Sequence, residues 1–250
     1  MVRLLLLILL FADVSAIAQS PRKLSQDTAF QLVVKEQSTI LLPGNYDSTK
    51  KYPLLIFLPF TGGTASDYVM MLASNPDDLT NYLYSSTEHA QKSFIILCPG
   101  DAGSVTDHSW KGFEACISRY EKRIIEDMAS LKTKYGIDTN NVVLCGYSLG
   151  GDLSWTISQR YPEKFKGAVI SGSRCSYSEK GMMARQAKKG FKYYFAMGKQ
   201  ESADRVNGMN NSIKLLNQAG VSYKNVQIDG EHAGFDIDHL KEALKYILYH

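Results

Sequence analysis

The chain lacks the features that mark nucleic-acid-binding and metal-binding proteins. Its 28 lysines and arginines against 25 aspartates and glutamates give a net charge of +3 at pH 7. These residues form no basic stripe, which argues against a nucleic-acid partner. The four cysteines include no Cys-x-x-Cys pair, and no histidine stands at zinc-finger spacing. The sequence therefore predicts no metal, and nothing in it implies an organic cofactor.

Internal repeats, linkers and low-complexity tracts are also missing. The 250 residues, 44% of them hydrophobic, are enough to enclose one large core. Residues 19–250 are therefore predicted to form a single domain.

The first 18 residues differ from the rest of the chain. Arg3 precedes the apolar run LLLLILLFA over residues 4–12, and AIA at residues 16–18 has the small-x-small form of a cleavage site. This pattern predicts a secretory signal peptide over residues 1–18, cleaved before Gln19. The apolar run is too short to span a bilayer comfortably, although an uncleaved anchor is the alternative. We expect a secreted or periplasmic protein without stable membrane insertion.

Export makes disulfides possible. Cys98, Cys116, Cys145 and Cys175 allow three pairings, among which the sequence does not choose. Cys98 with Cys116 is the first pair to test, because both flank one loop. Cys145 ends an apolar strand and fits a buried thiol equally well.

Short apolar runs recur along the chain and alternate with helical patterns. Runs of strand length occupy residues 52–60, 93–100, 141–147, 165–172, 191–198 and, in a more polar form, 221–230. One or two edge strands are expected over residues 30–43. Helical spacing is found over residues 118–136, 152–162, 206–220 and 236–250. The alternation predicts an α/β fold with a mostly parallel sheet and helices on both faces.

The most informative stretch is VVLCGYSLGGD, residues 142–152. It places the string GYSLG between an apolar strand and a helical pattern, which is the context of a nucleophile elbow. Gly146 and Gly150 allow a tight turn. Ser148 then stands at a helix N-terminus, where backbone N–H groups favour a developing negative charge. Ser148 is therefore the predicted nucleophile.

A serine nucleophile needs a base. Of the histidines after Ser148, His250 is terminal and His239 lies within the last helical pattern. His232 lies in the loop between the last strand and the last helix, at the carboxyl edge of the sheet. His232 is therefore the predicted base.

The base in turn needs an acid that orients it. The acid should follow the strand that ends at Gly198, where Glu201 and Asp204 both stand in the segment GKQESADRV. Local pattern does not separate the two.

Several motifs, taken in order, resemble a known family. ILLPGNYDSTKKYPLLIFLPFTGGTASDY, CPGDAG…HSWKGF, the serine block and IDGEHAGFD resemble the secreted small esterases of the α/β-hydrolase superfamily. These include feruloyl esterases, polyhydroxybutyrate-depolymerase-like enzymes and predicted peptidases. The resemblance implies Ser148 as nucleophile and His232 as base. It favours Glu201 as acid, because the acid of such enzymes often stands three residues after the strand-ending glycine.

The resemblance also implies an oxyanion hole. One donor is the backbone N–H of Leu149. The other comes from the residue after a His-Gly pair, which corresponds to Thr61. Here Pro59-Phe60 replaces His-Gly, so either Phe60 takes the backbone shape of glycine or the loop differs.

These features together predict a secreted serine hydrolase that cleaves carboxylic esters through an acyl-enzyme. The short segment between residues 172 and 191 leaves no room for a large lid, and an open cleft suits a bulky or polymeric ester better than a long buried acyl chain. The expected substrate is a small-molecule or polysaccharide-linked ester. Candidate substrate contacts are Phe60, Trp110, Tyr147 and Phe235. The alternatives are a serine peptidase or acyltransferase on the same fold, and a non-catalytic binding protein on a hydrolase scaffold.

Overall fold

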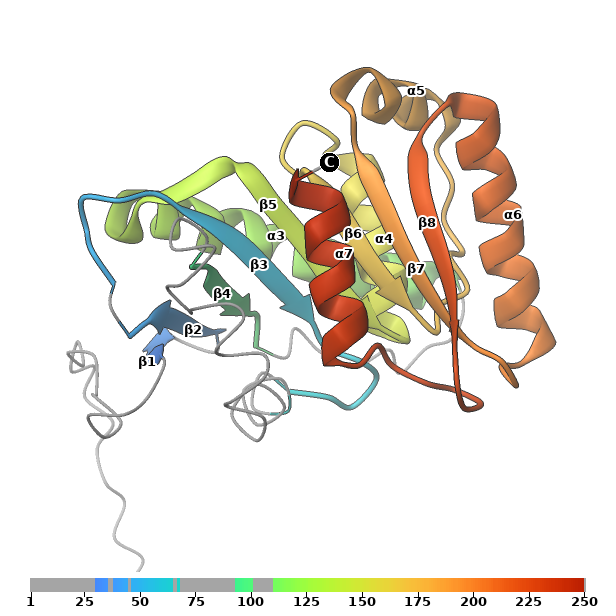
Figure 1. The fold of residues 1–250 in the computed structure, drawn as a ribbon, viewed down its shortest axis with the longest axis horizontal. Helices are drawn as coiled ribbons and strands as arrows, with labels where there is room; N and C mark the ends of the chain where they lie inside the picture. The colour runs from blue at the N-terminus through green and yellow to red at the C-terminus, as the bar shows by residue number, and fades with distance from the viewer. Residues whose placement is uncertain are drawn as a thin grey trace, which may run out of the picture.

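The computed structural model describes residues 30–35, 38–44, 46–64, 67, 93–100 and 110–249. Within these residues one sheet has eight strands in the order β1-β2-β4-β3-β5-β6-β7-β8 (Figure 1). The strands are β1 (Phe30–Lys35), β2 (Ser38–Pro43), β3 (Tyr52–Leu58), β4 (Ile95–Cys98), β5 (Ile137–Tyr147), β6 (Gly167–Ser171), β7 (Lys192–Gly198) and β8 (Ser222–Ile228). β2 runs antiparallel to β1 and β4, and the other pairs are parallel.

The described helices are α3 (Trp110–Tyr135), α4 (Leu149–Arg160), α5 (Lys180–Lys189), α6 (Ala203–Ala219) and α7 (Ile237–Tyr249). The predicted α/β fold with a mostly parallel sheet is confirmed. The polar character of β8 agrees with its place at the edge of the described sheet, where it pairs with β7. The predicted signal peptide, residues 1–18, lies outside the described residues and stays a prediction.

Two helices differ from the sequence prediction. α3 begins at Trp110 rather than at residue 118, because burial of Cys116 and Ile117 against the sheet outweighs the weak helix propensity of Gly112. α5 was not predicted. Gly190, which ends α5 in a left-handed conformation with φ 69°, is the signal in the sequence that marks it.

Side chains on the central strands alternate between two buried layers. On β3, Leu54 and Ile56 join the cluster that also contains the apolar faces of α3, α4, α5 and α6. Leu55 and Phe57 join the cluster that contains the apolar face of α7. Figure 1 shows α7 in front of the sheet and α3 and α4 behind it. The continuous apolar runs follow from this arrangement, because both faces of each strand are covered.

All four cysteines are free and buried, so the Cys98–Cys116 pairing is wrong. Cys98 belongs to the α7 layer and Cys116 to the opposite layer, so the sheet separates their thiols. Cys145 shares the α7 layer with Cys98, but β3 lies between their strands. Two strand spacings amount to about 9–10 Å, which exceeds the Cα separation of about 7 Å that a disulfide tolerates.

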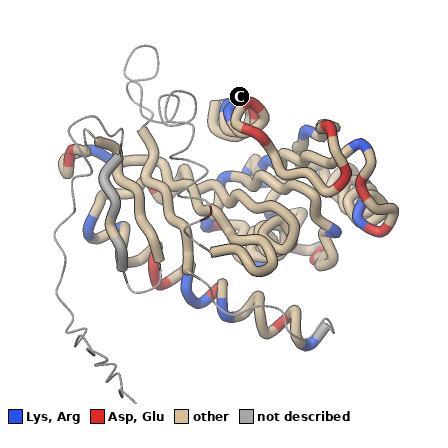
Figure 2. The backbone as a smooth tube through the Cα atoms, turned by 90° about the horizontal axis from the view of Figure 1, so that it is seen from below, with Lys and Arg blue, Asp and Glu red and all other residues tan. Residues whose placement is uncertain are grey.

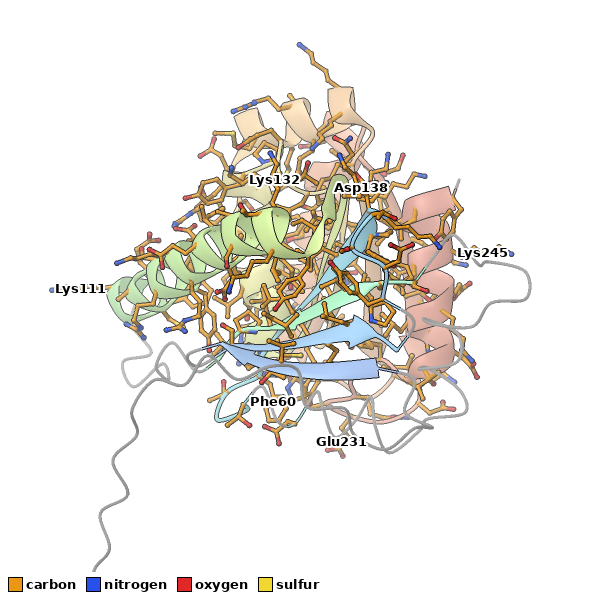
Figure 3. All side chains as sticks on the ribbon, turned by 90° about the vertical axis from the view of Figure 1, so that its left-hand side faces the viewer. Phe60, Lys111, Lys132, Asp138, Glu231 and Lys245 are labelled. Carbon is orange, nitrogen blue, oxygen red and sulfur yellow. The ribbon has the colours of Figure 1, made fainter. Side chains whose placement is uncertain are left out.

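The carboxyl ends of the parallel strands meet at one edge of the sheet. Figure 3 shows Phe60, after β3, and Glu231, after β8, at this lower edge, while Lys132 and Asp138 lie at the opposite end. The loops after β3 and β8 thus converge on this edge of the sheet.

Figure 2 shows basic and acidic residues interspersed along the described chain.

Candidate active site

Ser148 occupies a strained turn between β5 and α4. Its φ of 55° and ψ of −119° form a backbone conformation that residues with a side chain rarely adopt. The turn is held by the Ser148 N–H, which donates to the Ser171 carbonyl at 2.9 Å. Such an outlier is typical of a functional site, because it aims the hydroxyl away from the sheet.

Close backbone contacts explain the two flanking glycines. A Cβ on Gly146 would lie 2.0 Å from the carbonyl oxygen of Gly150. A Cβ on Gly150 would lie 2.1 Å from that of Leu58. Any side chain at either position would therefore push the start of α4 away from β5 or β3. The second contact also places the loop after β3 against the turn that carries Ser148.

The predicted nucleophile, base and acid lie in hydrogen-bond contact. Nε2 of His232 lies 3.0 Å from Oγ of Ser148, and its Nδ1 lies 2.7 Å from Oε2 of Glu201. With the proton on Nδ1, the imidazole donates to the carboxylate and accepts at Nε2 from the serine hydroxyl. The three residues come from loops after β5, β7 and β8, which only the parallel sheet brings together.

Glu201 is held as a carboxylate. Its side chain is 2% exposed, and this burial raises its pKa. Hydrogen bonds from His232 and the Ser202 backbone, together with the charges of His232 and Arg205, outweigh burial and lower the pKa overall. The group is therefore ionised at neutral pH.

Asp204, the other candidate acid, faces elsewhere. Its carboxylate accepts a bond from Nε of Arg174 at 2.6 Å, and its side chain is 55% exposed. Hydrogen bonds from Ser202 and Arg174 lower its pKa to about 2. The structure therefore brings Glu201, and not Asp204, to His232.

Tyr147 supports the histidine loop, a contact that the sequence did not reveal. Its hydroxyl donates to the His232 carbonyl oxygen at 2.6 Å, and the two rings lie 4.7 Å apart between centroids. The Ser171 hydroxyl donates to the Ala233 carbonyl at 3.0 Å in the same loop. A loop tied at two points holds the imidazole in place without substrate.

Asp152, one turn into α4, is a second residue that the sequence left without a role. It is 7% exposed and accepts a bond from the Ser173 hydroxyl at 2.8 Å. Burial raises its pKa, against the hydrogen bonds from Ser173 and the backbone of Cys175. Asp152 thus ties the loop after β6 to the elbow helix.

The loop after β3 differs from the expected glycine geometry. Among the described residues with side chains, only Ser148 and Cys175 have positive φ, whereas Gly62 has φ 76°. Phe60 therefore keeps ordinary backbone geometry, and the left-handed residue stands two positions later. Thr61 is exposed, and Leu149 is the half-buried first residue of α4. Because the Leu58 carbonyl packs against Gly150, the segments that carry both predicted oxyanion donors meet at the elbow.

The candidate substrate contacts divide into three cases. The Phe60 and Tyr147 rings lie near each other at this edge, with centroids 6.1 Å apart at 63°. Phe235 is 8% exposed and belongs to the α7 core, so its place in a cleft is corrected. The Trp110 side chain lies outside the described residues, and its backbone begins α3.

Among the described residues, no group of three or more His, Cys, Asp or Glu side chains could hold a metal ion. In the same part of the chain, no helix is both long enough and apolar enough to cross a membrane.

Comparison with known proteins places the fold. A family model described as the alpha/beta hydrolase fold matches residues 78–228, more than half of the chain. A CE1 ferulic acid esterase from Anaeromyces mucronatus, solved with ferulic acid, is similar with a TM-score of 0.66 at 16% identity. The match covers 94% of this chain and 97% of that one. At this identity the likeness concerns the fold.

Two curated relatives come from Aspergillus terreus. A probable dipeptidyl-peptidase 5 is 28% identical over 141 residues, which cover 54% of this chain and 18% of the relative. A probable feruloyl esterase C is 26% identical over 167 residues, which cover 63% of this chain and 57% of the relative. The chain thus spans less than two thirds of either relative.

Proposed function

The chain belongs to the α/β-hydrolase fold family, and from that premise we propose that it is a serine hydrolase that cleaves carboxylic esters through an acyl-enzyme. The observation that carries the proposal is the relay from Glu201 through His232 to Ser148, with contacts of 2.7 and 3.0 Å. A protein that only binds a ligand needs no such relay behind a strained serine.

The reaction follows from the placement of these groups. His232 accepts the Ser148 proton at Nε2 while Oγ bonds to the ester carbonyl carbon. The carbonyl electron pair moves to oxygen, where the N–H groups of Leu149 and Thr61 stabilise it. Collapse expels the alcohol, which takes the proton from Nε2. Water, deprotonated by His232, then releases the acid and restores the serine.

We propose an ester with a flat aromatic acyl group, attached to a small alcohol or to a polysaccharide. Phe60 and Tyr147 offer aromatic surface beside the serine, suited to stacking. The segment between β6 and β7 forms only the 10-residue helix α5, which leaves that side open to a bulky leaving group. A feruloyl esterase among the curated relatives and the ferulic acid esterase of similar fold support this choice.

A serine peptidase is the second candidate, because a probable dipeptidyl-peptidase is similar over 141 residues. Amide hydrolysis uses the same nucleophile, base and acid. The two functions therefore differ in substrate recognition, which a side-by-side assay on peptide and ester substrates separates.

We also propose that residues 1–18 direct export and that residues 19–250 form the mature domain outside the cytoplasm. The test is the location and the intact mass of the protein when its host expresses it. A chain outside the cytoplasm that begins at Gln19 supports the proposal, and a chain that stays in the cytoplasm with residues 1–18 contradicts it.

The nucleophile is tested by the intact mass after treatment with a fluorophosphonate, beside the Ser148→Ala variant. The probe requires an activated serine but not the right substrate. One adduct that is absent from the variant supports the proposal and justifies a screen of acetyl, butyryl and feruloyl esters with dipeptidyl amides as comparison. Folded protein that takes no adduct contradicts it.

A further inference from the structure

One charged group at the site has no part in the ester mechanism. Arg205, in the first turn of α6, has a side chain that is only 16% exposed. We propose that Arg205 is a positioning residue, whose charge holds the carboxylate of Glu201 in place and sets the acid limb of the pH–activity profile. The inference rests on the proposed function, because it concerns the same relay.

The two oxygens of Glu201 have different partners. Oε2 accepts from His232 Nδ1 at 2.7 Å. Oε1 accepts from the backbone N–H of Ser202 at 2.9 Å and from its hydroxyl at 3.2 Å, and Nη1 of Arg205 lies 3.8 Å away. The oxygen that does not meet the histidine is therefore fixed by its neighbours.

A glutamate has more need of such an anchor than an aspartate would have. Its side chain has one more rotatable bond, so more conformations compete with the one that meets the imidazole. The two hydrogen bonds from Ser202 and the nearby charge of Arg205 restrict that freedom. Arg205 and Ser202 thus allow the longer acid to present Oε2 at one place.

Arg205 also brings a positive charge close to the imidazole. Nη1 lies 3.5 Å from His232 Nδ1. Because Nδ1–H donates to Glu201, this nitrogen has no lone pair to accept from Arg205, so the contact acts through charge. The described titratable or charged groups in contact with the imidazole are Glu201 from the loop after β7, Arg205 from α6 and Tyr147 from β5. Glu231, the preceding residue, is exposed.

The place of Arg205 on its helix argues for a specific partner. A helix N-terminus carries partial positive charge and disfavours cations in the first turn. Arg205 stands in that turn, and its backbone N–H donates to the Ser202 carbonyl at 3.1 Å. Asp204 is the favourable charge there, but it is committed to Arg174. The carboxylate of Glu201 offsets the unfavourable position of Arg205.

The sign of the effect on activity follows from the charges. The positive charge of Arg205 repels a proton on the imidazole of His232, whereas the carboxylate of Glu201 attracts it. Removing the arginine charge leaves that attraction unopposed, so activity should begin to fall at a higher pH than in the wild type. The acid limb of the activity profile should move upward by about 0.7–3 pH units, the size expected for one charge about 4 Å away at an effective dielectric constant between ~80 and ~20.

The test measures the rate of fluorophosphonate inactivation and kcat/KM for a short-chain ester between pH 5 and 9. Arg205→Gln should move the acid limb upward and lower the plateau about 3- to 10-fold through looser positioning. Arg205→Lys, which keeps the charge, should leave the limb within about 0.3 unit of wild type. Arg205→Met retains the apolar stem and replaces the glutamine variant if that protein does not fold.

Arg174→Gln is the matched control. It removes an arginine from the same edge, which pairs with Asp204 at 2.6 Å rather than with the described side chains of Ser148, His232 or Glu201. Its limb should move by less than about 0.2 unit, because exposed charges are screened.

An unmoved limb in an Arg205→Gln enzyme with a lower plateau would reduce Arg205 to a structural role and overturn the inference. Equal shifts in the two arginine variants would overturn it as well, since the effect would then be one of general charge. A wild-type protein without Ser148-dependent inactivation contradicts the proposed function itself, and the inference with it. That outcome is distinct, because it is seen before any arginine variant is made.

Discussion

Replacement of each candidate acid by its amide, in separate variants, is the most direct test of the site. Glu201→Gln and Asp204→Asn each convert a carboxylate into an amide of similar size. With Nδ1 and Oε2 2.7 Å apart, the charges of Glu201 and a protonated His232 are centred about 4 Å apart. At an effective dielectric constant of ~20 that separation is worth ~4 kcal/mol, a factor of ~10³ in rate. An amide that also favours the wrong histidine tautomer raises the loss toward ~10⁴.

We therefore expect Glu201→Gln to lower kcat for a chromogenic short-chain ester by ~10³–10⁴. Asp204→Asn should stay within about twofold of wild type, because Asp204 is half-exposed and faces Arg174. Both variants must be fully folded at the assay temperature, as thermal melting curves show, for the comparison to hold. The reasoning fails if Glu201→Gln retains a tenth of the activity, or if Asp204→Asn loses as much as Glu201→Gln.

Three further predictions concern the support of the site. Tyr147→Phe removes the 2.6 Å bond to the His232 carbonyl and should cost about 1 kcal/mol in unfolding free energy with a several-fold lower kcat; unchanged kinetics would refute the supporting role. Gly146→Ala puts a Cβ 2.0 Å from the backbone oxygen of Gly150 and should abolish folding or activity. Gly220→Ala, at φ 72° with nothing within 4 Å, should cost only about 1–2 kcal/mol, and equal melting temperatures for the two would contradict this account. Because folding lowers the pKa of Glu201, its ionised carboxylate stabilises the fold at pH values above the usual glutamate range. The difference in unfolding free energy between wild type and Glu201→Gln should therefore disappear as the pH falls from about 5 to 3. Denaturant titrations at each pH measure this difference.

Part of the fold could be predicted because it depends on residues that are close together in the sequence. The strands of the parallel sheet are runs such as residues 52–58, buried on both faces, so their apolar character is continuous. The first turns of α3 were missed because tertiary burial, as at Cys116, stabilises a helix where propensity does not. α5 was missed although most of its residues favour a helix and Gly190 marks its end. The cysteine pairing also failed on a non-local fact, since Cys98 and Cys116 lie on opposite sides of the sheet.

The choice of the acid likewise depended on tertiary contacts rather than on local sequence. Glu201 and Asp204 stand three residues apart on one loop, and both suit the composition of an active site. The turn into α6 directs Asp204 toward Arg174 in the loop after β6, while Glu201 reaches His232, 31 residues along the chain. Arg205 went unnoticed for the same reason, because an arginine gains meaning only from the carboxylate that it meets.

The sequence by itself determined the alternation of strand and helix, the tight turn around Ser148 and the placing of His232 in the last loop. Each of these depends on short-range sterics or on periodic burial, which neighbouring residues encode. Only the tertiary structure decided that Glu201 meets the histidine, that Tyr147 holds the histidine loop, and that four thiols stay apart. Those outcomes depend on the order of strands in the sheet, and that order brings together residues far apart in the chain.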